Sequence, residues 1–346
     1  MDKELFSEIK DEEFKYPLYA NALEKEGLLG YYKESKYIAN SITITARGNI
    51  GHSIVRKSDF NAIGRLIILN SKKELNNDFF SEYINSNLKF YIESTGVPQL
   101  TAPSLKINKV KYPNLDEQNK ISNFILAINK KIELLEKKLV LYQNFYSNIV
   151  NTYFDNINYK KILKFSDIIK KGKAGGTPKS SNKDYYGGNI PFLSINDMTT
   201  QGKYINYTEK MITNEGLNNS SAWILPKNSL LYSIYASIGF VSINKIELTT
   251  SQAIYGIILK DNVNQDFIYH YLKNYKRQIH KFIETGTQGN LNSKIVNNIK
   301  IKLPSTEEQL FYSTLFNKFD ESIEIKEKQI NELKKFKKGL LQKMFI

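Results

Sequence analysis

The feature that most constrains the fold of this chain is an internal duplication. Residues 109–118, KVKYPNLDEQ, align with residues 300–309, KIKLPSTEEQ, which sets an offset of 191 residues. The alignment runs without gaps from 93–154 onto 284–345, and 14 of its 62 positions are identical. Most other core-type positions are apolar in both copies, so the chain is expected to build the same local structure twice.

The similarity continues upstream in a looser form. GNIG at 48–51 resembles ASIG at 236–239, each after a β-type run, and AIGRLIIL at 62–69 resembles AIYGIIL at 253–259. A helical stretch follows each of these, near 79–93 and 265–284. We therefore predict the order globular part, loop and long helix in both copies.

Each copy ends in a strongly specified helix. Asn114 and Ser305 stand three residues before Glu117 and Glu308, which is the spacing of a capping box, and a proline lies just outside each. An apolar 4-3-4-3 repeat then follows, without exception in copy one and with two lysines in copy two. Its positions are Ile121, Ile125, Ile128, Ile132, Leu135, Leu139, Tyr142, Tyr146, Ile149 and Tyr153, and Tyr312, Phe316, Phe319, Ile323, Lys326, Ile330, Leu333, Lys337, Leu340 and Met344.

Apolar stripes of this kind need a partner helix. We predict that the two helices pair antiparallel, because a parallel pair would require the chain from 160 to 300 to return along a whole helix. The alternative is that they are ordinary buried helices of two separate domains. The length argues against it, since residues 117–153 would span roughly 55 Å at about 1.5 Å per residue.

The globular parts read as mixed α/β, with short Val, Ile, Tyr and Thr strands punctuated by Gly, Asn and Ser. The predicted fold class is α+β: two similar mixed α/β units separated by two long antiparallel coiled-coil helices. The predicted domains are a first globular unit at 1–112, a first helix at 113–156, a second globular unit at 157–303 and a second helix at 304–346.

Composition excludes several kinds of catalyst. The chain has no cysteine and three histidines, none with a carboxylate partner at ligand spacing, which disfavours zinc sites, thiol nucleophiles and hydrolase triads. It has no Walker A loop and no GxGxxG, and the nearest string to a methyltransferase element, Asn189 to Phe192, lacks the first proline. We predict a chain that is not an enzyme. The absence of cysteine and of an 18-residue apolar run favours a cytoplasmic protein without a membrane partner.

The charge favours a polyanionic partner. The net charge is +14, and residues 160–285 hold 17 basic against 9 acidic residues, whereas residues 1–95 hold 13 against 14. The signal is modest, because a Lys- and Asn-rich chain with four arginines also fits an AT-rich genome.

Polar and basic loop residues are the candidates for contacts with DNA bases and phosphates. In the first unit these are Arg47, Asn49, Arg56, Lys57 and Gln99; in the second they are Lys173, Lys179, Ser180, Asn182, Lys183, Thr287, Gln288 and Asn290. Arg47 is the most attractive guanine reader, and the lysines suit phosphates better than bases. The alternative for each residue is an ordinary solvated loop position.

These patterns together resemble a known family, the specificity (S) subunits of type I restriction–modification systems. GGTPKSSNKDYYGGNIPFLSINDM at 175–198 resembles the opening of a target recognition domain. YPNLDEQ and LPSTEEQ resemble the start of the family's spacer regions, and TGTQGNLN at 285–292 resembles the loop before a spacer. The resemblance covers nearly the whole chain.

The resemblance implies a DNA sequence-specificity subunit. Two target recognition domains would each read one half of a bipartite site in double-stranded DNA. The spacer helices would set the gap and dock modification (methyltransferase) subunits, two in number, and restriction (endonuclease and translocase) subunits would join them. S-adenosylmethionine, ATP and Mg would be bound by those partners and no cofactor by this chain. The family's base-reading residues vary too much to transfer, so the site residues rest on the loop argument alone.

One departure from the family pattern concerns the first unit. Sixteen residues precede Pro17, whereas 31 residues, from Lys160 onward, precede the corresponding Pro191 and include the strand-like KKILKFSDIIK. We expect the first unit to lack its opening strand, as in a truncated or rearranged gene.

Two other functional classes stay open at this point. The first is a coiled-coil scaffold that binds proteins and never touches DNA. The second is a fused methyltransferase or nuclease, for which the sequence offers no residues.

Overall fold

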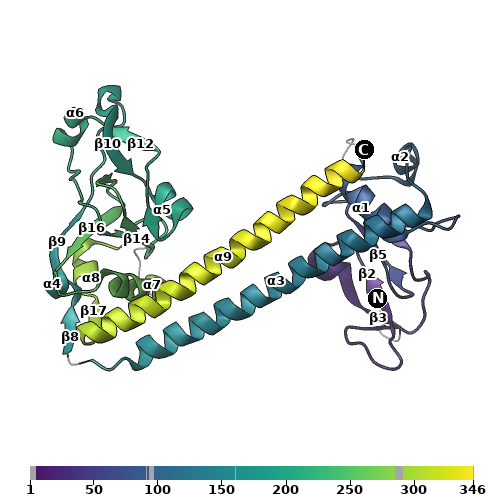
Figure 1. Cartoon of the computed structure of the whole chain (residues 1–346), viewed down its shortest axis with the longest axis horizontal. Helices are drawn as coiled ribbons and strands as arrows, with labels where there is room; N and C mark the ends of the chain where they lie inside the picture. The colour runs from purple at the N-terminus through teal and green to yellow at the C-terminus, as the bar shows by residue number, and fades with distance from the viewer. Residues whose placement is uncertain (1–4, 91, 93–96, 160, 285–290, 346) are drawn as a thin grey trace. The chain divides into compact units, whose positions relative to one another are not determined.

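The computed structural model describes residues 5–90, 92, 97–159, 161–284 and 291–345, with the side chains of 280–284 left out. The chain forms two compact units: unit 1 is Met1–Leu139 with Lys326–Ile346, and unit 2 is Val140–Ile325. Two long helices, α3 (Leu115–Asn156) and α9 (Thr306–Met344), each contribute one part to each unit (Figure 1).

The described part of unit 1 forms two small sheets. β1 (Phe6–Ser7), β3 (Leu28–Tyr32), β2 (Tyr16–Tyr19) and β6 (Asn61–Ala62) form one, and β5 (Ser53–Val55), β4 (Ile42–Thr45) and β7 (Leu66–Leu69) form the other. The helices are η1 (Glu24–Gly27), α1 (Asn77–Asn87) and α2 (Ala102–Lys106). α1 and α2 cover the three-stranded sheet, so that Ile42, Ile44, Ile84, Leu100 and Leu105 form one buried core.

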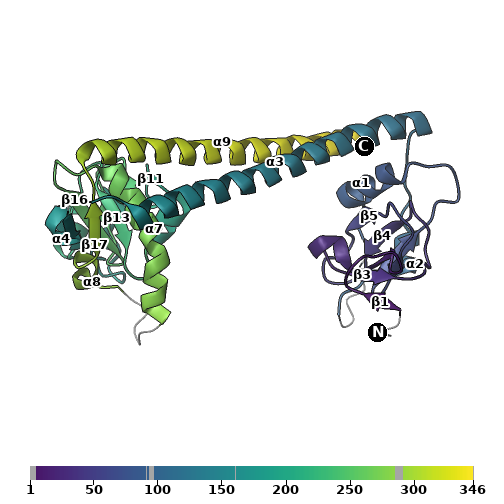
Figure 2. The same cartoon turned by 90° about the horizontal axis from the view of Figure 1, so that it is seen from below.

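Unit 2 is larger, and its described residues form three sheets. β11 (Tyr204–Ile205), β14 (Val241–Asn244), β13 (Leu230–Ser233), β16 (Ile254–Leu259) and β9 (Ile169–Ala174) form the largest; β12 (Lys210–Ile212), β10 (Tyr186–Leu193) and β15 (Thr249–Thr250) form the second; β17 (Lys300–Leu303) pairs with β8 (Lys161–Lys164). Its helices are α4 (Phe165–Ile168), η2 (Lys183–Tyr185), α5 (Ile195–Gln201), α6 (Asn214–Asn218), α7 (Gln265–Glu284) and α8 (Ser293–Asn297). The apolar face of α7 packs against the five-stranded sheet (Figure 2).

The two units repeat one layout, which confirms the predicted fold class. β4 lies between β5 and β7 as β13 lies between β14 and β16, with Ile42 opposite Leu69 and Leu230 opposite Ile257. The ladders therefore equate Leu69 with Ile257, and the sequence alignment of 62–69 with 253–259 was wrong by two residues there. The cause is a change of offset between α1 or α7 and the long helix that follows it, which short apolar runs do not reveal.

The long helices are antiparallel in each unit, as predicted. In unit 1, Glu136 of α3 forms an ion pair with Lys334 of α9 at 2.6 Å, while the earlier Ile125 packs with the later Leu341. In unit 2, the ring centroids of Tyr153 and Tyr312 lie 3.6 Å apart. Those of Tyr146 and Phe319 lie 5.0 Å apart. Rising positions on α3 thus meet falling positions on α9 in both units.

The helix starts are also as predicted. The Glu117 N–H donates to Asn114 Oδ1 at 2.9 Å, and the Glu308 N–H donates to Ser305 Oγ at 3.2 Å. Each side chain satisfies one of the free amides that a helix leaves at its first turn.

A buried glutamine joins each long helix to the globular part before it. Gln118 Nε2 donates to the Pro113 carbonyl at 2.8 Å, and its Oε1 accepts from the Asn76 N–H at 3.0 Å. Gln309 repeats this with the Pro304 carbonyl at 3.0 Å and the Asn264 N–H at 3.0 Å. Asn76 and Asn264 are themselves the caps of α1 and α7, because they accept from the backbone N–H of Phe79 and Phe267.

A second shared position is polar in both units but differs in chemistry. In unit 1, Glu82 of α1 accepts from Asn129 Nδ2 at 2.8 Å and pairs with Lys337 at 3.1 Å. In unit 2, His270 of α7 takes the place of Glu82, and its Nε2 lies 2.7 Å from Asn317 Oδ1. Because that oxygen accepts, Nε2 carries a proton. Burial lowers the pKa of His270 to about 4, so the imidazole is neutral at pH 7.

Replacing Gln309 with alanine should lower the free energy of unfolding by about 2 kcal/mol, because a buried carbonyl and a buried N–H both lose their partner. Gln309 is 2% exposed, whereas Gln342 of the same helix is exposed and provides the matched alanine control. Urea unfolding followed by circular dichroism measures both. Equal stability of the two variants would contradict the glutamine clamp.

His270 should make unit 2 sensitive to acid. Burial lowers its pKa from 6.5 to about 4, so the unfolded chain binds its proton first as the pH falls. The stabilisation is present above pH 6.5 and is lost as the pH falls toward 4. Between pH 7.5 and pH 5 the loss from this group should be about 2 kcal/mol. In the His270→Gln variant, the pH dependence of unfolding over this range should shrink by that amount; an unchanged slope would refute the assignment.

Candidate nucleic-acid interface

Several loops of unit 2 leave the five-stranded sheet at the same end. β13 ends there at Ser233, β14 and β16 begin there, and β9 ends there at Ala174. The Gly175 N–H donates to the Ile254 carbonyl at 2.9 Å, and the Ile234 N–H donates to the Ala253 carbonyl at 2.8 Å. The hairpin turn 234–240 and the loop that follows β9 therefore start side by side.

The loop 175–183 is anchored at both ends and exposed between them. Gly175 and Gly176 have no room for a side chain, since a Cβ would lie 2.1 Å from the Thr250 carbonyl oxygen or 2.2 Å from Ser221 Oγ. The Tyr186 hydroxyl donates to the carbonyl of the buried Pro178 at 2.7 Å. The predicted residues Lys173, Lys179, Ser180 and Lys183 are exposed.

Asn182 has a structural role in the same loop. Its side-chain oxygen accepts from the Asp184 N–H at 3.1 Å and caps the short helix η2. Its amide nitrogen is the part of the side chain that the cap does not use.

Unit 1 has the same sheet end with different residues. The Gly51 N–H closes the β4–β5 turn on the Thr45 carbonyl at 2.8 Å, as the Gly239 N–H closes the β13–β14 turn on the Ser233 carbonyl at 3.0 Å. Arg47 thus corresponds to Tyr235.

The structure brings Arg47 and Gln99 together in an antiparallel bridge. It adds a residue that the sequence did not indicate: Arg65, whose Nη1 donates to Gln99 Oε1 at 2.9 Å. Asn49 is exposed in the turn beside them. The clue to Arg65 was its place directly after Gly64, which has a φ of 73° in the turn before β7.

Arg56 was wrongly predicted as a surface residue. It is 3% exposed, its Nε donates to Thr43 Oγ1 at 2.9 Å and its Nη2 donates to the Glu26 carbonyl at 3.0 Å. The guanidinium also lies 3.6 Å from the ring centroid of Tyr19, and burial lowers its pKa. Arg56 therefore holds the two sheets of unit 1 together and is not accessible to a ligand.

The structure gives less support to the other predicted residues as DNA contacts. Lys57 is exposed but its Nζ lies 2.6 Å from Asp78 Oδ1, so its charge is already paired. Thr287, Gln288 and Asn290 lie outside the described residues. The described chain resumes at Leu291, whose N–H donates to the Ile234 carbonyl at 2.9 Å. The corresponding bond in unit 1 runs from the Leu100 N–H to the Ala46 carbonyl at 2.8 Å.

Two other kinds of site are absent from the described residues. No group of three His, Asp or Glu side chains within them is arranged to hold a metal ion. No helix in the same part of the chain combines the length and apolarity needed to cross a membrane.

These features define a duplicated α/β protein in which each unit presents a loop-rich sheet end and contains an antiparallel pair of long helix segments. Residues 2–141 and 158–335 match the model of the type I restriction modification DNA specificity domain. The chain belongs to this family, which confirms the resemblance found in the sequence.

Named relatives support the same family. The chain is 32% identical over 205 residues to the type I restriction enzyme MjaIX specificity subunit of Methanocaldococcus jannaschii, covering 56% of this chain and 47% of the relative. It is 27% identical over 308 residues to the putative MjaX specificity subunit of the same organism, covering 80% and 69%. The chain spans about half the length of the first of these.

A solved structure shares the fold. The S subunit of a type I restriction–modification system from M. genitalium superposes with a TM-score of 0.62 at 17% identity, over 100% of this chain and 91% of that one.

Proposed function

We propose that this chain reads a bipartite DNA sequence as the specificity subunit of a type I restriction–modification complex. The observation that carries the proposal is that the DNA specificity domain matches both units, and that each unit presents exposed polar side chains at the same end of its sheet. The rival, a coiled-coil scaffold that never touches DNA, finds no support in this family.

The two sheet ends are suited to different contacts. Lys173, Lys179 and Lys183 give unit 2 three exposed cations for phosphate oxygens. In unit 1, Gln99 orients Arg65 beside Arg47, and an oriented guanidinium can bond both O6 and N7 of guanine. Each unit would thus read one half of the site.

The long helices supply the second part of the proposal. They set the gap between the half-sites and dock two modification (methyltransferase) subunits, which restriction subunits join. S-adenosylmethionine, ATP and Mg are bound by those partners in the cytoplasm, and this chain contributes recognition without catalysis.

Charge reversal of Lys173, Lys179 and Lys183 to glutamate should weaken DNA binding by the chain with its modification partner. Each lysine that contacts a phosphate should also lower the slope of log K against log salt by about 1. Fluorescence anisotropy over a range of salt concentrations measures both quantities.

The control reverses Lys227, Lys245 and Lys260, which follow or precede the same strands at the opposite end of the sheet. This variant has the same net charge but should keep the wild-type slope. Equal losses in the two triple variants would show that only overall charge matters and would contradict the proposed interface.

Shortening both helices by one heptad should change the gap and not the half-sites. Removing 133–139 from α3 and 326–332 from α9 takes out about 10 Å, which is up to about 3 base pairs. Methylome sequencing of cells carrying the variant provides the measurement. Altered half-sites with an unchanged gap would refute the role of the helices as a spacer.

A further inference from the structure

Arg47 of unit 1 carries a guanidinium that the described chain leaves unsatisfied. Its Nε is buried and has no hydrogen-bond acceptor among the described residues. A buried donor without an acceptor is rare in folded proteins, because it loses its bonds to water and gains none in return. Arg47 follows the end of β4, at the loop-rich end of the sheet. The missing acceptor is therefore one that a ligand at this sheet end can supply.

Arg65 and Gln99 add more donors beside Arg47. The Gln99 Oε1 atom accepts from Arg65 Nη1 at 2.9 Å, so the amide oxygen is directed at the guanidinium. The amide nitrogen of Gln99 and the other nitrogens of Arg65 have no acceptor within the described ranges. Neither guanidinium forms an ion pair with a described carboxylate. The cluster thus presents N–H groups and positive charge, which favours an anionic ligand with exposed acceptors.

Asn21 fixes the backbone that carries Arg47. Its Oδ1 accepts from the Ala46 N–H at 2.8 Å and from the Arg47 N–H at 3.2 Å, and its Nδ2 donates to the Arg47 carbonyl. On the other side of the chain, the Leu100 N–H donates to the Ala46 carbonyl at 2.8 Å. The donors are therefore held in place before a ligand arrives, which lowers the entropy that binding has to remove.

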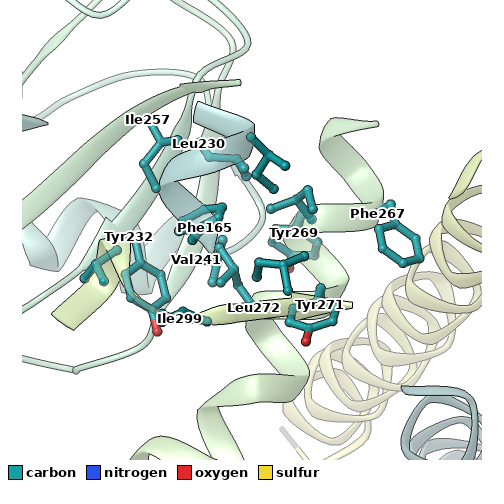
Figure 3. Close-up of a cluster of buried hydrophobic side chains, with 14 of the residues drawn as sticks. Phe165, Leu230, Tyr232, Val241, Ile257, Phe267, Tyr269, Tyr271, Leu272 and Ile299 are labelled. Atoms are coloured by element: carbon teal, nitrogen blue, oxygen red, sulfur yellow. The ribbon is translucent and has the colours of Figure 1, made fainter. Parts of the chain in front are cut away.

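The strands beneath this cluster have the same packing in unit 2. There Leu230, Tyr232 and Val241 anchor the β13–β14 hairpin in the core (Figure 3). In unit 1, Ile42 and Ile44 anchor β4 in the same way. A difference between the two sheet ends is therefore a difference in side-chain chemistry and not in the course of the strands.

The polar residues of the cluster have other counterparts in unit 2. The hydrogen bonds at the strand ends equate Arg65 with Ala253 and Asn21 with Ile195. The turn itself carries Tyr235. Neither alanine nor isoleucine has a side-chain donor, so this pair of arginines with its two polar supports belongs to unit 1.

A set of donors without an acceptor distinguishes among the four bases. In the major groove guanine presents two neighbouring acceptors, N7 and O6, whereas adenine presents an acceptor beside a donor. Cytosine presents a donor, and thymine presents one acceptor beside a methyl group. In the minor groove the acceptors of an A·T pair lie on separate bases. A planar guanidinium fork therefore matches the guanine edge best.

We propose that unit 1 reads guanine in the major groove through Arg47 and Arg65, with Asn21 and Gln99 as positioning residues. The inference rests on the proposed function, and it adds the base that is read and the residues that hold its readers.

Base analogues test the proposal on the chain with its modification partner and the site found by methylome sequencing. Replacing a guanine with 7-deazaguanine removes N7 and should weaken wild-type binding about tenfold at a position in one half-site. In the Arg65→Met variant the same replacement should have no further effect, and the other half-site should be read as before. Weakening by 3-deazaadenine alone, which removes a minor-groove acceptor, would overturn the proposal.

Variants at Gln99 and Asn21 test the positioning roles. Gln99→Met should lower the ratio of affinities for guanine and adenine at that position, whereas Gln99→Glu keeps an acceptor for Arg65 and should keep the ratio. Asn21→Ala should lower the ratio too. The matched control is Asn85→Ala, because the Asn85 side chain bonds the N–H and the carbonyl of Ser53 at 2.8 and 2.9 Å, away from the cluster. Fluorescence anisotropy measures each affinity.

The outcomes separate this proposal from the proposed function. An equal loss of guanine preference in Gln99→Met and Gln99→Glu, or in Asn21→Ala and Asn85→Ala, would refute the positioning roles. Sequence-specific binding without a guanine preference that depends on Arg65 would overturn the inference and leave the proposed function intact. A complex with no sequence preference at all would overturn both.

Discussion

The contact on which the rest of the structure depends is the buried glutamine at the start of each long helix. Gln118 and Gln309 each bond a proline carbonyl on one side and, on the other, the N–H of the residue that caps α1 or α7. A helix that only packed through apolar side chains could slide or rotate by a residue at small cost. A buried amide with two fixed partners removes that freedom, because any shift leaves both partners unsatisfied. The direction of each long helix is thereby tied to its own globular part.

The polar clusters around Glu82 in unit 1 and His270 in unit 2 make the two copies chemically different. In unit 1 the cluster contains Lys337 of α9 and Asn129 of α3. The corresponding residues in the unit 2 cluster are Tyr146 of α3 and Asp320 of α9. Both clusters therefore join the two long helices to α1 or α7, but with different chemical groups. In unit 1 a carboxylate meets an ammonium. In unit 2 a neutral imidazole meets the Tyr146 hydroxyl and the Asn317 amide, with the Asp320 carboxylate 3.9 Å from its Nδ1. The nearest carboxylate thus stands on α1 in unit 1 but on α9 in unit 2, so the two clusters are not interchangeable.

The parts of the fold that local sequence determines could be predicted. Helix caps, apolar stripes and the duplication all depend on residues close together in the chain, and the antiparallel pairing followed from the length of the connection. Burial of a single polar residue depends instead on distant partners. Arg56 is covered by Tyr19 and Glu26, which lie 30 or more positions earlier in the chain, and the pattern around Arg56 itself gives no sign of them. Arg65 was missed for the same reason, since its partner Gln99 comes from another loop.

The correspondence between the two sheet ends shows how one scaffold can present different side chains at the same geometric position. The turn after β4 and the turn after β13 are closed by the same bond from a glycine N–H, and in both a hydroxyl on the strand, Thr45 or Ser233, donates to a carbonyl of the turn. These contacts involve backbone and small side chains, so they hold the turn in place whatever stands at its tip. Arg47 and Asn49 occupy the tip in unit 1, and Tyr235 and Ser237 occupy it in unit 2. A scaffold fixed by backbone bonds leaves those positions free to differ, and different side chains at one geometric position are what the proposed reading of two unlike sequences requires.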